Sequence, residues 1–116
     1  MDAPTSTDLE RAFFSLPDHE RERIIRHGVA LRAADLQKRL FLANSKVRAF
    51  AEHYRTTLEQ LEKAGLPDNA SLEMHEDYIQ WRHWAGVVHQ VTQTIAALQH
   101  LAHQGIPGEA FLDAGD

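Results

Sequence analysis

The sequence lacks cysteine, long hydrophobic runs and an N-terminal targeting pattern. None of the 116 residues is a cysteine, which excludes disulfides, thiolate nucleophiles and metal sites built from cysteine ligands. No apolar stretch approaches the roughly 18 residues of a membrane-spanning helix. Residues 1–7 lack the basic and apolar regions of a signal peptide. We therefore expect a cytoplasmic protein that does not associate with membranes and that is stabilised by packing.

The sequence motifs of the common enzyme classes are also absent. There is no glycine-rich phosphate loop, no nucleophile elbow of the glycine-serine-glycine type, and no pair of zinc-binding histidines flanking a glutamate. The nearest match to that zinc motif, at residues 75–79, lacks the second histidine. We therefore expect a non-enzymatic protein with no catalytic residues and no cofactor.

Composition and length are those of an ordinary globular chain. With 43% hydrophobic and 25% charged residues in 116 positions, disorder is not expected and a single domain is. The two kinds of charge are separated, with nine basic and three acidic residues from Arg21 to Arg55, and two basic and nine acidic residues from Thr56 onward. A basic helix and an acidic helix would attract each other within one chain or across a dimer. Nucleic-acid binding by the basic face around Arg21–Arg55 is the alternative, although the overall charge of −5 argues against it.

Two stretches of the chain carry a heptad pattern, in which apolar residues alternate steps of four and three. This spacing is typical of a coiled-coil seam. Because a short connector separates the two seams, the pattern predicts an all-α fold, a long antiparallel helical hairpin that is coiled-coil-like. The seam residues are Val29, Ala33, Leu36, Leu40, Ala43, Val47, Phe50 and Tyr54, then Trp81, Trp84, Val88, Val91, Ile95, Leu98 and Ala102.

Local signals place the ends of the predicted helices. Pro17 suits the first turn of a long helix, Thr56 and Glu59 have the spacing of a capping box, and Gly65 is a stop signal. Glycine and proline at 105 and 107 end the last helix. The predicted organisation is a frayed N-terminus at 1–6, a short helix at 7–16, a long helix at 17–54, a connector helix at 57–64, a long helix at 72–104 and a loose tail at 108–116.

Several large apolar residues lie off the predicted seam. Leaving them in water forgoes roughly 1.5–3 kcal/mol for each side chain that could be buried. Two hairpins packed face to face would cover them, so we expect a homodimer with a four-helix core. A monomeric three-helix arrangement and a hetero-complex are the alternatives. The candidate interface residues are Ile24, Leu31, Phe41, Leu42, Val87 and Leu101.

The densest group of functional side chains lies at the start of the last long helix. One interpretation is an aromatic plug that seals the hairpin end against Phe50 and Tyr54. A second is a partner-binding patch, because tyrosine and tryptophan beside acidic residues are common at recognition surfaces. A third, an acid/base pair of carboxylates, lacks a nucleophile. The candidate partner-binding residues are Glu76, Asp77, Tyr78, Trp81 and Trp84.

Eight histidines raise the question of a metal site. Only His100 and His103 share a helix face at a useful spacing, and His27 could add a third nitrogen in a favourable hairpin register. The glutamate-histidine pairs of di-iron bundles are absent. We expect solvated histidines and no metal.

Over residues 47–98 the sequence resembles small helical proteins, some of which look like antitoxin components encoded beside a small toxin. The shared features are a phenylalanine-acid-tyrosine phrase at 50–54, a capped short helix at 57–61, and an acidic stretch leading to a tryptophan at 75–81. The resemblance implies a protein that binds and restrains another polypeptide through its helices. The DNA-binding module that often accompanies antitoxins has no counterpart here, so the resemblance does not extend to autoregulation.

These observations together favour an interaction or regulatory module that binds a protein partner. A toxin-like protein is one candidate for that partner. Nucleic-acid binding is the second hypothesis, and a metal-dependent enzyme is the third.

Overall fold

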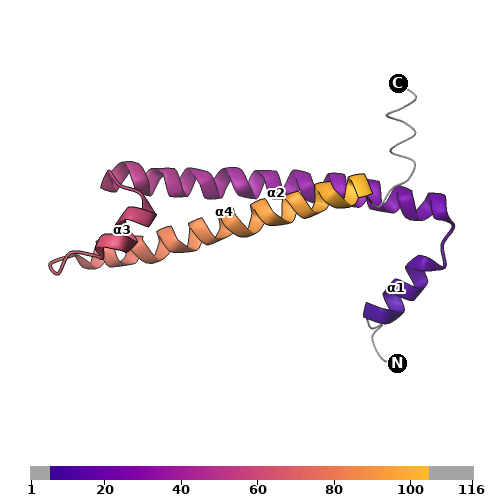
Figure 1. The fold of residues 1–116 in the computed structure, drawn as a ribbon, viewed down its shortest axis with the longest axis horizontal. Helices are drawn as coiled ribbons and strands as arrows, with labels where there is room; N and C mark the ends of the chain where they lie inside the picture. Colours follow the sequence, from indigo (N-terminus) through magenta and orange to yellow (C-terminus); the bar gives the residue numbers. More distant parts are fainter. Residues whose placement is uncertain (1–5, 105–116) are drawn as a thin grey trace, which may run out of the picture. The chain divides into compact units, whose positions relative to one another are not determined.

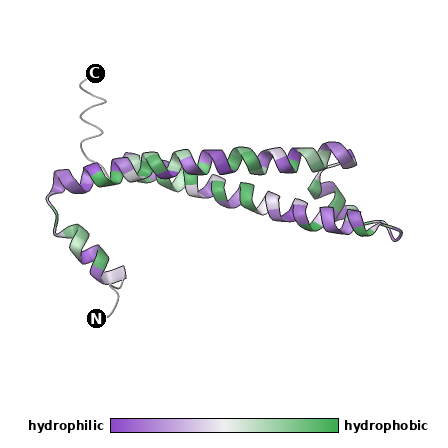
Figure 2. Ribbon diagram, turned by 180° about the vertical axis from the view of Figure 1, so that it is seen from behind, coloured by the Kyte–Doolittle hydropathy of each residue, from purple (hydrophilic) through white to green (hydrophobic). Residues whose placement is uncertain are grey.

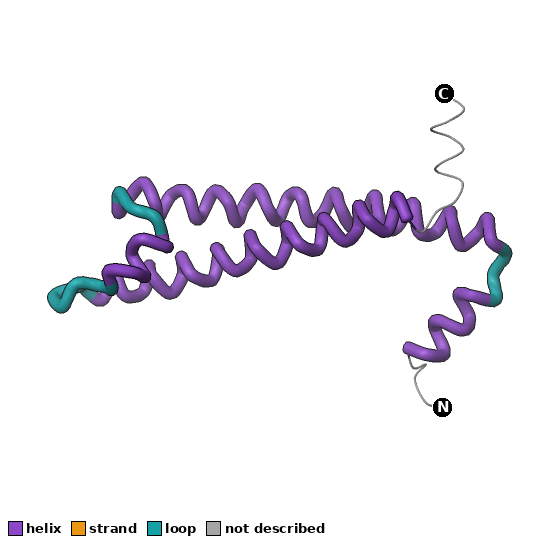
Figure 3. The backbone as a smooth tube through the Cα atoms, viewed as in Figure 1, coloured by secondary structure: helices purple, strands orange, loops and turns teal. Residues whose placement is uncertain are grey.

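A computed structural model describes residues 6–104, which form four helices and no strand. The helices are α1 (Ser6–Phe14), α2 (Asp18–Tyr54), α3 (Leu58–Ala64) and α4 (Leu72–Gln104) (Figure 1). Short loops join them (Figure 3). The predicted all-α class is confirmed. The expected loose tail, the stop signal beyond α4 and most of the frayed N-terminus lie outside the described residues.

The helix ends lie close to the expected positions, with small shifts. Helix α4 begins at Leu72 as predicted and continues to Gln104, the last described residue, and α2 begins one residue later than expected. The first helix starts at Ser6, which the sequence placed in the frayed end, and it stops at Phe14, before Leu16 and Pro17. The loop between α1 and α2 is therefore longer than predicted.

The capping box of α3 begins one residue later than predicted. Thr57 is the N-cap, in an extended conformation, and its hydroxyl accepts a hydrogen bond of 3.1 Å from the Gln60 backbone N–H. The Gln60 side chain in turn accepts from the Thr57 N–H. The expected cap, Thr56, was wrong because Arg55 takes a positive φ of 54° and turns the chain before the helix starts. At the other end Gly65, at φ 77°, donates to the Leu61 carbonyl and ends the helix as predicted.

Arg21 fixes the turn between α1 and α2. Its guanidinium donates to the carbonyl oxygens of Phe14 at 3.0 Å and Leu16 at 2.5 Å, forms an ion pair with Asp18, and lies 5.9 Å above the Phe14 ring. Carbonyl groups at a helix end have no partner within the helix. One side chain of α2 therefore satisfies the C-terminal end of α1.

By their internal contacts the described residues fall into two compact units, one of residues 6–33 with 97–104 and one of residues 34–96. In the second unit α2 and α4 pack side by side, and α3 lies where α2 ends and α4 begins (Figure 1). Phe50 stacks on Trp81 with ring centroids 5.9 Å apart. The antiparallel register that this contact defines sets Leu36, fourteen residues earlier, opposite Ile95, fourteen residues later. The predicted packing of two long helices is confirmed, whereas a single domain and true coiled-coil geometry stay predictions.

The predicted seam is the buried side of the helices. Every heptad residue of both tracks is buried or half-buried, and hydrophobic and hydrophilic positions alternate along α2 and α4 (Figure 2). Burying apolar side chains in such a seam is the main source of stability for helices of this kind. Among the described residues, the buried ones are Leu36, Ala43, Trp81, Val87, Val91 and Ile95.

The acidic residues of α4 that could attract the basic helix α2 are confined to its first turns. They are Glu73, Glu76 and Asp77, in the first six positions of α4, and residues 78–104 contain no aspartate or glutamate. Within the unit of residues 34–96, most of α2 therefore faces a part of α4 that has no acidic residue. No described helix combines the length and apolar character that crossing a membrane requires.

Two glycines of this fold give opposite predictions. Gly86 lies inside α4 with open space where a Cβ would be, so Gly86→Ala should raise the free energy of unfolding by about 1 kcal/mol through helix propensity. Gly65→Ala also has space, but its φ of 77° should make it destabilising by about 1–2 kcal/mol. Denaturant unfolding followed by circular dichroism measures both. Equal effects of the two substitutions would contradict the assigned conformations.

Candidate functional site

Trp81, the centre of the predicted recognition cluster, is a core residue. Its side chain is only 1% exposed. It stacks on Phe50 and on Tyr54, with ring centroids 5.9 and 6.1 Å apart. The indole Nε1–H is buried and finds no acceptor among the described residues, which costs about 1–3 kcal/mol. The aromatic-plug interpretation is therefore the right one for Trp81, and the partner-binding assignment of this residue was wrong because α2 covers it.

Asp77 is also engaged by α2. The Tyr54 hydroxyl donates a hydrogen bond of 2.5 Å to its carboxylate. This bond, together with burial and the nearby negative charges of Asp77 and Glu73, raises the pKa of Tyr54 to about 12. The contact joins the last residue of α2 to the second turn of α4, and it lies beside the Trp81 stack.

Tyr78 helps to attach α3 to α4. Its hydroxyl donates to the Glu62 carboxylate at 3.4 Å, and the Arg82 guanidinium lies 3.7 Å from the same carboxylate and 5.8 Å above the Tyr78 ring. A half-exposed network of this kind contributes little stability by itself. It does, however, give the connector helix a defined position on α4.

The two remaining members of the cluster differ in exposure. Glu76 is exposed, and Trp84 is half-buried, with its ring centroid 5.1 Å from that of His83 in an edge-to-face arrangement. The structure thus gathers Asp77, Trp81 and their α2 partners into one packed end of the hairpin, and leaves Glu76 outside it.

The predicted interface residues also differ in exposure. Five of the six are exposed, with Leu31 at 70% and Phe41 at 75%; these five are Ile24, Leu31, Phe41, Leu42 and Leu101. Val87 was wrongly assigned, because it is only 6% exposed in the single chain. It lies four residues before Val91, on the same side of α4. The apolar side of α4 is therefore wider than the heptad pattern alone indicates.

One group of residues was not recognised from the sequence. It lies on α2 between Lys38 and Arg48. Four cations, Lys38, Arg39, Lys46 and Arg48, surround the exposed side chains of Phe41 and Leu42. The signal was present in the sequence, because these eleven positions contain four basic residues and no acidic one. We call these six residues the basic apolar face.

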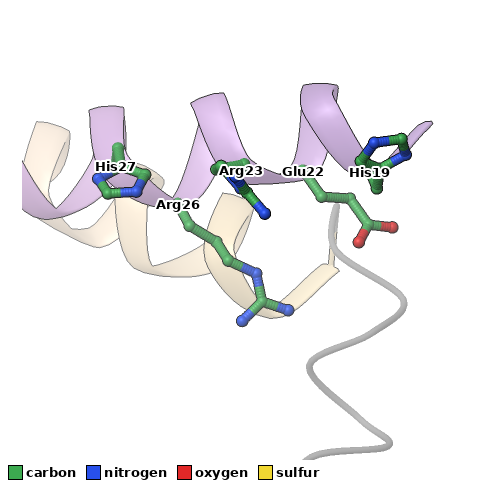
Figure 4. A pocket seen from close by; sticks show the side chains of 5 residues that line it. All are labelled: His19, Glu22, Arg23, Arg26 and His27. Atoms are coloured by element: carbon green, nitrogen blue, oxygen red, sulfur yellow. The ribbon is translucent and has the colours of Figure 1, made fainter. Parts of the chain in front are cut away.

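A shallow hollow of about 330 Å³ lies on the first turns of α2 (Figure 4). Its lining side chains all come from this one helix, and a glutamate lies among the basic groups. Side chains of a single helix do not enclose a ligand, so the hollow has few means of selecting one. The residues are His19, Glu22, Arg23, Arg26 and His27.

The histidines do not gather into a metal site. Within residues 6–104, no three side chains of histidine, aspartate or glutamate converge as a metal ion would require. The arrangement in which His27 joins His100 and His103 is therefore not formed.

Comparison with known protein families, curated proteins and solved structures finds no match for this chain. The resemblance to antitoxin-like proteins consequently stays a prediction.

Truncating Trp81 tests its place in the core. Trp81→Ala should lower the free energy of unfolding by about 3–5 kcal/mol because it leaves a cavity at the packed hairpin end. Trp81→Phe should cost less, since it keeps an aromatic ring and removes the unpaired N–H. Ile79→Ala, at an exposed position of the same helix, is the control and should stay within about 0.5 kcal/mol. Similar denaturant midpoints for Trp81→Ala and the control would contradict the burial of Trp81.

The raised pKa of Tyr54 predicts a loss of stability at alkaline pH. A phenol whose pKa is 10 unfolded and about 12 folded contributes stability that is complete below pH 10 and is lost as the pH rises towards 12. Tyr54→Phe should lack this part of the alkaline loss. The protein has two tyrosines, so in a Tyr78→Phe background the ultraviolet absorbance of tyrosinate reports Tyr54 alone. Titration of that signal near pH 10 would contradict the Tyr54–Asp77 hydrogen bond.

Proposed function

We propose that this chain is a non-enzymatic helical interaction module that binds a protein partner, as the resemblance to antitoxin-like proteins implies. The observation that supports this proposal is the amount of large apolar side-chain surface left uncovered by the chain itself. Single exposed apolar residues are common in monomeric proteins, whereas repeated ones along helices are typical of interaction surfaces. The exposed large apolar residues are Leu9, Phe14, Leu16, Ile24, Leu31, Phe41, Leu42, Leu72, Ile79 and Leu101.

The spacing of these residues suits helix–helix association. Ile24 and Leu31 are seven residues apart on α2, so they share one side of the helix, and they are 47% and 70% exposed. Complete burial of such a side chain contributes roughly 1.5–3 kcal/mol. A partner that covered both would gain a substantial part of its binding free energy from them.

The engagement of reactive groups by the fold also supports binding over catalysis. The Asp77 carboxylate accepts from Tyr54, and the Tyr78 hydroxyl is paired with Glu62. A catalytic acid or base would need to reach a substrate. The exposed carboxylate of the candidate cluster, Glu76, has no serine, threonine or cysteine among its neighbours in the helix.

Association can take two forms within this proposal. Two copies related by a two-fold axis would form a homodimer with a four-helix core. Two-fold symmetry is the most common symmetry of soluble oligomers. A hetero-complex with a small toxin-like protein would cover the same kind of apolar surface. Both forms use exposed side chains of the long helices.

The nucleic-acid alternative receives less support. Over the whole of α2 the basic residues do not follow one side of the helix; Arg21 and Arg23, for example, are two residues apart, and residues at this spacing do not face the same side. Nucleic-acid binding favours cations clustered on one face. The basic charge of α2 is instead divided among its sides.

Removing two exposed apolar groups tests the proposal. The double variant Ile24→Ser and Leu31→Ser should keep the helix content of the wild type while losing association, because both side chains are exposed in the single chain. Light scattering and sedimentation over a range of concentrations measure self-association, and co-purification with the product of a neighbouring gene measures hetero-association. Val91→Ser, at a buried position, is the contrasting variant and should lower stability instead.

A wild-type protein that is monomeric at every concentration and that co-purifies with no neighbouring product would contradict the proposal. Binding to DNA or RNA that weakens steeply as salt is raised would instead support a nucleic-acid-binding function.

A further inference from the structure

The basic apolar face of α2 lies on the side of the helix that α4 does not cover. Between Lys38 and Arg48, the seam residues Leu40, Ala43 and Val47 are buried or half-buried. Phe41 and Leu42 are exposed, at 75% and 47%. This stretch of α2 therefore has one apolar side packed within the hairpin and a second apolar site open to a partner.

The cations of this face are not neutralised by the hairpin. Lys38, Arg39, Lys46 and Arg48 are all exposed, and none forms an ion pair with another described side chain. The opposing part of α4 contains no acidic residue. On α2 itself the nearest acids flank the segment, Asp35 on one side and Glu52 on the other. The positive charge within the segment is thus left for a group outside the hairpin.

Three of the four cations lie on either side of the apolar pair, and Lys38, three residues before Phe41 and four before Leu42, lies between the two. Arg39 and Lys46 are seven residues apart and follow one edge of the face, whereas Arg48 is seven residues from Phe41 and continues the other edge. Flanking charges of this kind select the partner and its orientation in paired helices. The face therefore specifies its occupant by charge as well as by shape.

We propose that this face binds an acidic amphipathic helix of another protein. This inference rests on the proposed function and identifies the chemistry of the partner. Apolar residues three or four apart on the partner helix would cover Phe41 and Leu42, and carboxylates on both sides of them would pair with the four cations. Opposite charges at the rim of an interface give specificity and speed of association.

Other occupants fit this face less well. A second copy that packed this same segment face to face would set cations against cations, because the segment has no acid of its own. The phosphates of a nucleic acid would neutralise the cations but would leave Leu42 uncovered. A membrane-surface helix needs a broad apolar face, whereas this segment exposes two large apolar side chains.

A designed peptide pair tests the inference with the full-length protein. The first peptide is a helix of about three heptads with leucine at the seam positions and glutamate at the flanking positions. The second carries lysine in place of each glutamate. Fluorescence anisotropy at low and at physiological salt should show binding of the acidic peptide, weakening as salt is raised, and no binding of the basic one.

Two variants and their matched controls locate the binding. Arg39→Glu with Lys46→Glu should weaken binding of the acidic peptide by about tenfold or more, whereas Arg11→Glu with Lys63→Glu, which changes the net charge equally, should leave it unchanged. Phe41→Ser should weaken binding by a similar factor, and Ile79→Ser, at another exposed apolar position, should not. Circular dichroism verifies that each variant retains its helix content.

Four results would overturn the inference. Equal binding of the two peptides would show that charge does not select the occupant. Conversion of a wild-type dimer to a monomer by Phe41→Ser would assign the face to a second copy. The wild type could instead bind duplex DNA or anionic vesicles and not the acidic peptide. If the Arg39→Glu, Lys46→Glu variant then lost that binding, the face would be assigned to those anions. If none of these peptides binds while a neighbouring gene product still co-purifies, the interaction function stands and this assignment of its surface fails.

Discussion

The burial of Trp81 between Phe50 and Tyr54 is the contact on which the arrangement of the hairpin depends. It sets the register of α2 against α4, because regular helices carry one fixed pair through every later turn. The Tyr54–Asp77 hydrogen bond beside it reinforces the same register with a directional contact. A slip by one residue would remove both, so large aromatic side chains and one polar bond define a packing that small seam residues alone would specify weakly.

This use of the aromatic groups explains which side chains remain for the interaction that we propose. Tryptophan and tyrosine side chains often identify a recognition patch. In this chain Trp81 and Tyr54 instead pack against each other and hold α2 and α4 together. The surface left for a partner is made instead from aliphatic and phenylalanine side chains along α2, bordered by cations. Since α4 is neutral over most of its length, it can pack its apolar side on α2 without neutralising that charge. The charge asymmetry of the sequence thus becomes a property of one exposed face.

Much of the local structure could be predicted from the sequence. The start of α4 and the glycine stop at Gly65 follow from signals a few residues long. The cap of α3 was missed by one residue because Arg55 adopts a positive φ that no neighbouring residue demands. Val87 was placed on the outside because a strict heptad describes a narrow seam, whereas α4 buries a wider side.

The sequence by itself determined which segments are helical, where they end and which residues share a helix side, because helical periodicity and capping are local properties of the chain. The tertiary structure decided which functional groups stay available. Trp81 and Asp77 lie within one short segment whose chemistry suggests a site, yet their partners come from residues more than twenty positions earlier. Only the antiparallel packing of α4 on α2 brings those partners into contact, and it leaves Phe41, Leu42 and the surrounding cations exposed on the opposite side of α2.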